Sequence, residues 1–216
     1  MFDYTVINAA LITHSQPSMK ISLSDSAYDL LASGKSRAAK SFLKLSPGRL
    51  YLMAGSWELT GSRMHEYIID CALNGAVTVL TGGNRFALYD IAYDLYQYTD
   101  EFIDLLENRV FLYRADTCYQ VLDLLQKTPH WSVPTLISDM LVTFDDESVR
   151  EEEVDQLLAE CLEELHRLKQ NAPVLVSAQI GQRRQRLLKA LLRAADEVQW
   201  LLPKAEKRPI QPRLIE

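Results

Sequence analysis

Short apolar runs alternate with longer amphipathic segments along the chain from about residue 49 onward. Most of the runs are continuously apolar, which is typical of parallel strands that are covered on both faces. The pattern predicts six strands, at residues 50–54, 76–80, 110–113, 134–138, 173–178 and 198–202. Because repeated strand–helix units form a parallel sheet with right-handed crossovers, the sequence predicts an α/β fold.

The segments between these runs have the three- and four-residue spacing of helices. The clearest one begins at Glu151, where acidic residues fill the first turn and apolar residues recur along one face. Acidic side chains at that end favour the helix dipole, so a stable amphipathic helix is expected. The predicted helices cover residues 64–73, 87–106, 119–127, 151–170 and 182–195.

The two ends of the chain differ from this core. Residues 1–47 are polar and rich in serine, and we interpret them as an N-terminal extension that packs on a core domain at 48–202. Residues 203–216 contain three prolines and are predicted to form an extended tail that could dock on a partner. No apolar run approaches the roughly 20 residues of a membrane span, and no signal peptide is evident, so we expect a cytoplasmic protein without membrane contact.

Composition narrows the possible chemistry. The chain has 216 residues and a net charge of −6, so its overall field does not attract polyanions. The three cysteines are far apart and are expected to be reduced thiols, not disulfides or zinc ligands. The four histidines have no metal-ligand spacing and are expected at the surface or in packing, so no metal site is predicted; they are His14, His65, His130 and His166.

The segment AGSWELTGSR, residues 54–63, stands where a phosphate-binding loop would follow the first strand. A functional loop of this kind reads GxxxxGK[ST], with a lysine for the phosphates and a hydroxyl for magnesium. Gly61 fits the second glycine, but Ser62 and Arg63 stand at the lysine and hydroxyl positions. The alternative is an ordinary strand–turn–helix connection that contains a glycine.

Five segments in order resemble the RecA/RadA/KaiC superfamily of P-loop ATPases. They are LSPGRLYLMAG, GAVTVLTGGNRF, FLYRADTCYQVLDLL, PTLISDMLVTF and APVLVSAQI, and they span about residues 45–202. The resemblance implies a RecA-like three-layer α/β fold, with a mainly parallel central sheet flanked by helices.

The same resemblance implies roles for single residues. Asp139 matches the magnesium-side aspartate of the Walker B strand, Gln179 matches the sensor glutamine, and Gly82 stands at the position of the catalytic glutamate. Because phosphoryl transfer depends on positioned charge, the missing lysine and glutamate argue against efficient hydrolysis, and no catalytic residue is assigned. A nucleotide site, if functional, would use Gly61, Ser62, Arg63, Asp139 and Gln179 with ATP and magnesium; otherwise no cofactor is expected.

A basic cluster near the last helix offers a second candidate site, formed by Arg183, Arg184, Arg186 and Lys189. It could contact nucleic acid or an acidic partner, or it could be a solvated helix face. The acidic segment DDESVREEE, residues 145–153, would instead repel phosphate.

These observations favour a non-hydrolysing pseudo-ATPase that acts as an accessory binding or assembly protein. By resemblance, its setting would be DNA recombination or repair, with an active recombinase, a repair factor or further copies of itself as partners. Two alternatives stay open, namely a weak nucleotide-binding ATPase and a protein that binds DNA directly through the basic cluster.

Overall fold

The structure of the protein is a computed structural model that describes residues 45–83, 88–129, 131–179 and 183–201. Nearly all of the predicted N-terminal extension and all of the predicted tail at 203–216 lie outside the described residues.

The centre of the molecule is a six-stranded sheet with the order β3-β2-β4-β5-β1-β6. Each pair of neighbouring strands is parallel. All six predicted strands are confirmed, with small shifts of their ends. They are β1 (Leu50–Gly55), β2 (Val77–Gly82), β3 (Val110–Ala115), β4 (Thr135–Ser138), β5 (Val174–Gln179) and β6 (Glu197–Leu201).

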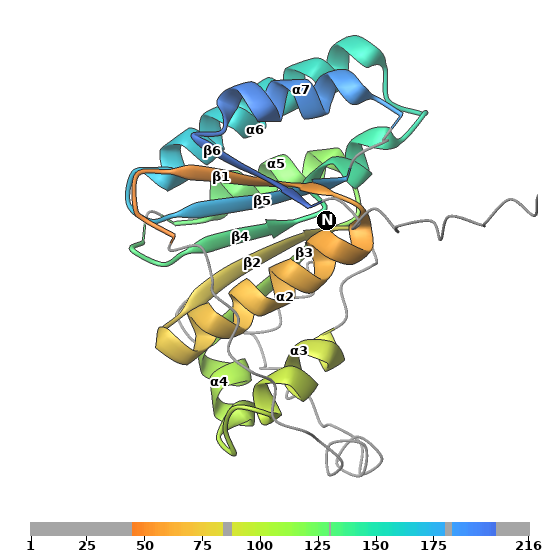
Figure 1. Cartoon of the computed structure of the whole chain (residues 1–216). Coiled ribbons are helices and arrows are strands. Elements are labelled where there is room, and N and C mark those ends of the chain that lie inside the picture. The colour runs from red at the N-terminus through yellow and green to blue at the C-terminus, as the bar shows by residue number, and fades with distance from the viewer. Residues whose placement is uncertain (1–44, 84–87, 130, 180–182, 202–216) are drawn as a thin grey trace, which may run out of the picture.

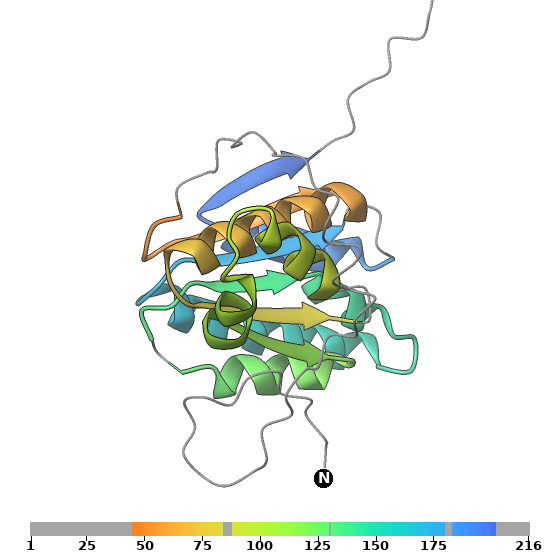
Figure 2. The ribbon, with the colours of Figure 1, turned by 90° about the horizontal axis from the view of Figure 1, so that it is seen from below.

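Helices cover both faces of the sheet, which makes three layers (Figure 1; Figure 2 shows the sheet from below). One face carries α2 (Trp57–Asn74), α3 (Leu88–Tyr96) and α4 (Phe102–Arg109). The other carries α5 (Cys118–Lys127), α6 (Glu151–Lys169) and α7 (Gln185–Ala194), and a short 3₁₀ helix, η1 (Met140–Asp145), follows β4. The predicted α/β class, with a parallel sheet flanked by helices, is confirmed, and the architecture is consistent with a RecA-like arrangement.

Strand alternation divides the core into two halves. Leu50 and Leu52 of β1 pack with α5, α6 and α7, whereas Tyr51 and Met53 pack with α2, α3 and α4. Successive side chains of a strand point to opposite faces, so a continuously apolar strand fills both halves at once. This burial explains the long apolar runs in the sequence.

The predicted helix at 87–106 is in fact two helices. In the described structure α3 ends at Tyr96 and α4 begins at Phe102. The Thr99 hydroxyl accepts a hydrogen bond from the backbone N–H of Glu101 at 3.1 Å, a local bond that competes with helical pairing. Tyr96 and Phe102 then pack edge to face, with their ring centroids 5.3 Å apart, across the break.

Candidate functional site

The segment predicted as a phosphate-binding loop is helical. Only Ser56 separates β1 from α2, and Gly61, Ser62 and Arg63 lie within α2. The backbone N–H of Thr60 already bonds to the Ser56 carbonyl at 3.0 Å, as in a first helical turn. The expected loop is therefore absent from this described segment.

The physical reason lies in the burial of α2. Its buried positions Thr60, Met64, Tyr67 and Ile68 recur at three- and four-residue intervals, so the amphipathic pattern extends toward the strand. We interpreted Gly61 as a turn signal, but its φ is not among the positive values of the described glycines. The helix therefore begins seven residues earlier than the predicted start at residue 64.

Arg63 does not take part in a site at the sheet edge. Its guanidinium donates to the Glu66 carboxylate at 2.6 Å, one turn further along α2. Both side chains are mostly buried, and the pair stabilises the helix surface. The weak-ATPase alternative needs the charge of Arg63 to act in place of the missing lysine. For that, the ion pair between Arg63 and Glu66 would have to break.

Gly82 is the last residue of β2, and it lies very close to the backbone that follows β4. A Cβ atom at this position would lie 2.5 Å from the Asp139 carbonyl oxygen, closer than real Cβ contacts occur. A side chain here would therefore displace the backbone after β4. The position that the resemblance assigns to a catalytic glutamate has no room for one in this backbone.

Asp139 and Gln179 both lie where the resemblance places them, at the carboxyl ends of β4 and β5. Asp139 is buried, adopts the left-handed conformation (φ 52°, ψ 39°), and its backbone N–H donates to the Ser177 hydroxyl at 2.9 Å. Gln179 lies beside Gly55 in the β1–β5 register, and its buried Nε2 has no hydrogen-bond partner in the described part of the chain. The positions are as expected, while their roles stay predictions.

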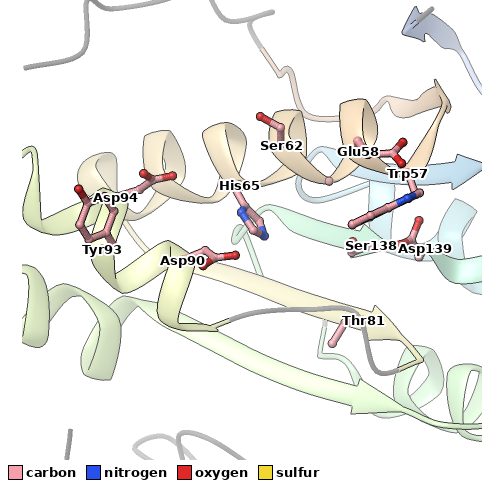
Figure 3. Close-up of a pocket in the computed structure, with 11 residues that line it drawn as sticks. Trp57, Glu58, Ser62, His65, Thr81, Asp90, Tyr93, Asp94, Ser138 and Asp139 are labelled. Atoms are coloured by element: carbon pink, nitrogen blue, oxygen red, sulfur yellow. The ribbon is translucent and has the colours of Figure 1, made fainter. Parts of the chain in front are cut away.

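A pocket of about 420 Å³ opens at this edge of the sheet (Figure 3). Its floor comes from the ends of β2 and β4, and its walls come from α2 and α3. It brings Gly61 and Ser62 together with Asp139, but Arg63 and Gln179 do not line it. The lining residues are Trp57, Glu58, Gly61, Ser62, His65, Thr81, Asp90, Tyr93, Asp94, Ser138 and Asp139.

The lining is acidic. It includes the carboxyl groups of Glu58, Asp90, Asp94 and Asp139, and none of the described lining residues is lysine or arginine. Burial lowers the pKa of His65 below its ordinary value, although the charges of Asp90 and Asp94 act in the opposite direction. A neutral imidazole at pH 7 leaves the pocket with its negative charge.

Sequence reasoning missed most of this pocket. From the sequence we assigned His65 no role beyond that of a surface or packing residue. In the structure His65 lines the pocket, and Tyr93 of α3 is 37% exposed at its wall. The spacing of Asp90 and Asp94 on one helical face was a usable signal, but the sequence pattern alone does not show which strands lie beneath α3.

The predicted basic cluster is paired with the predicted acidic segment. Arg183 forms an ion pair with Glu147, and Arg186 pairs with both Glu151 and Asp155, the latter at 2.8 Å. The structure thus brings together two features that we had treated separately, and their charges largely offset each other. Lys189 is exposed.

Arg184 has a different role from its neighbours. Its side chain is 6% exposed, and it donates to the carbonyls of Phe144 and Val149 and to the Glu151 carboxylate at 2.9 Å. These bonds tie the start of α7 to η1 and to the start of α6. Arg184 is therefore a structural residue, not an exposed binding residue.

Other expectations can be checked within the same ranges. The three cysteines are free thiols, as predicted, and burial raises the pKa of Cys71 to about 12. No group of three or more candidate metal ligands occurs among the described residues. Of the helices in the described ranges, none combines the length and apolar character that a membrane crossing requires.

The fold and the pocket define a three-layer α/β protein with an acidic site at the carboxyl edge of a parallel sheet. Comparison with models of known protein families gives no match, and comparison with curated proteins gives no significant match.

Proposed function

We propose that this protein is a non-hydrolysing α/β protein of RecA-like architecture that acts by binding and assembly. The observation that carries the proposal is the junction between β1 and α2. With Ser56 as its only linking residue, it leaves no loop whose backbone N–H groups could surround a chain of phosphates.

The charge of the pocket supports the same conclusion. A nucleotide triphosphate needs lysine, arginine or a metal ion to offset its negative charge. The described pocket offers carboxylates and a neutral histidine instead. Like charges in a partly enclosed site repel more strongly than they do in water, so the lining disfavours a phosphate ligand.

The biological setting is the part of the proposal that depends on the resemblance alone. We propose an accessory role in DNA recombination or repair, with an active recombinase, a repair factor or a second copy of the chain as partner. The pairing of Arg183, Arg184 and Arg186 with acidic residues or buried carbonyls argues against direct DNA binding by these arginines.

Calorimetric titration with ATP, with and without magnesium, tests the proposal. We expect no binding at about 1 mM ATP, corresponding to less than about 4 kcal/mol of binding free energy. Asp139→Ala serves as the diagnostic variant. Magnesium-dependent binding at micromolar ATP that this variant weakens would contradict the proposal and favour the weak-ATPase alternative.

A further inference from the structure

The floor of the pocket carries two hydroxyl groups, which belong to largely buried residues. Thr81 lies on the same face of β2 as Val77 and Val79, and Ser138 lies on the same face of β4 as Leu136, so both point toward the α2 layer. Thr81 is 4% exposed and Ser138 is 7% exposed, and both line the cavity.

Neither hydroxyl oxygen is among the fully buried, unpaired side-chain atoms of the described residues, and both residues line the open cavity. Two hydroxyl groups at the bottom of one cavity, on neighbouring strands, are therefore available to a ligand that supplies hydrogen-bond donors or acceptors.

The walls indicate the charge of that ligand. Glu58 and Asp90 are exposed carboxylates at the pocket, and the rings of Trp57 and Tyr93 are 48% and 37% exposed beside them. Carboxylates attract cations, and aromatic faces attract them through the ring quadrupole. Figure 3 shows the side chains of Trp57 and Asp90 extending from α2 and α3 into the space beside the sheet, whereas Glu58 and Tyr93 lie further out.

We propose that this pocket binds an organic cation, namely a guanidinium or ammonium group, with its N–H groups donating to the floor hydroxyls and to the carboxylates of the wall. The cavity of about 420 Å³ is within the usual range for small-ligand sites. The inference rests on the proposed function, because a nucleotide bound at this edge of the sheet would occupy the space that the cation needs. The cation can come from a free small molecule or from an arginine or lysine side chain of a partner protein.

The test uses the full chain and two matched probes in calorimetry. N-acetyl-L-argininamide carries the guanidinium group, and the citrulline analogue has nearly the same shape without the charge. We expect binding of the arginine compound at millimolar concentration or below, and none of the citrulline compound. No binding of the arginine compound at about 10 mM, or equal binding of both compounds, would overturn the inference.

A pair of double variants separates the pocket from general electrostatics. Glu58→Gln with Asp90→Asn removes two exposed wall charges and should weaken binding about fivefold or more. Glu107→Gln with Glu163→Gln changes the net charge equally at exposed positions on α4 and α6, and should leave binding unchanged. Equal weakening by both double variants would contradict a site in the pocket.

A third arm identifies the source of the cation. A glycine-flanked peptide with one arginine should bind more tightly than the arginine compound if a partner side chain is the natural ligand, and equally if a free cation is. Titration with magnesium-ATP on the same preparation keeps the two proposals distinguishable. If neither the arginine compound nor magnesium-ATP binds, the cation site alone is overturned. If magnesium-ATP binds, the proposed function is overturned.

Discussion

Arg184 is an arginine that the sequence pattern places in a surface cluster and that the structure buries. Its guanidinium satisfies the carbonyls of Phe144 and Val149, which belong to the connection between β4 and α6. A long basic run near a helix start does not reveal this, because the partners lie some 35 to 40 residues earlier in the chain.

Replacing this side chain should be costly. Arg184→Met leaves Glu151 without one partner and two carbonyls without donors, and we expect the free energy of unfolding to fall by about 3 kcal/mol. Urea unfolding measures the change. Arg193→Met, at an exposed position of the same helix, should change it by less than about 0.5 kcal/mol. Similar losses in the two variants would show that Arg184 is not buried as described.

Asp196 gives the fold a dependence on pH. The backbone N–H of Leu50 donates to its carboxylate at 2.7 Å and Lys169 does so at 2.8 Å, and these bonds hold the pKa of Asp196 below its ordinary value. A carboxyl group whose pKa is lowered on folding stabilises the folded state at every pH above its ordinary pKa, here 3.8. This stabilisation is lost as the pH falls through the lowered pKa of the folded state.

Asp196→Asn should therefore be less stable than the unaltered protein at pH 7, by about 1 kcal/mol because the site is partly exposed. The difference should shrink as the pH falls below about 4. Urea unfolding at a series of pH values measures both. A difference that grows in acid would have the wrong sign and would contradict the assignment.

At the level of elements, the strands were predictable and some helix boundaries were not. A buried parallel strand must be apolar on both faces, so β1 and β5 stand out in the sequence. The α6 helix stands out because its apolar stripe and acidic first turn agree. The early start of α2 follows from burial of its first turns, which the sequence pattern did not reveal, and the break after α3 coincides with a local hydrogen bond at Thr99. Gly61 suggested a turn where the structure has a helix.

The candidate site was predictable only in part. The resemblance found Asp139 at the end of β4, because a polar residue after a buried strand is a local pattern. The other wall of the pocket comes from α3, which joins it only because β2 lies next to β4 in the sheet. That order is a long-range property, and the local spacing of Tyr93 and Asp94 cannot reveal it.

Helix caps offer a test of how the elements begin. The Thr117 hydroxyl accepts a hydrogen bond from the backbone N–H of Gln120 at 3.3 Å and caps α5, whereas Ser56 makes no side-chain cap on α2. Thr117→Ala should lower the free energy of unfolding by about 1 kcal/mol, and Ser56→Ala should have a smaller effect. Chemical unfolding compares the two variants. A larger loss at Ser56 would indicate a capping or ligand role that the structure lacks.

At the scale of the whole molecule, the charged side chains discussed above form two groups, one on each side of the sheet. The acidic segment before and within α6 is offset by the arginines at the start of α7, on one side of the sheet. The carboxylates of the pocket lie on the other side, between α2 and α3, without lysine or arginine among the described lining residues. The protein thus has a net charge of −6 and, in addition, a local acidic site. Its negative charge suits cations and disfavours phosphates.

The central claim is that a helix occupies the place of a phosphate-binding loop, and Gly61→Ala tests it most directly. A Cβ atom at Gly61 meets nothing within 4 Å, and alanine is the better helix former, so the free energy of unfolding should rise by about 0.5–1 kcal/mol. Gly55→Ala is the control, because its Cβ would collide with the Leu201 carbonyl and should destabilise the protein. A clear loss of stability in Gly61→Ala would mean that this glycine holds a loop conformation that alanine cannot adopt, and would contradict the account.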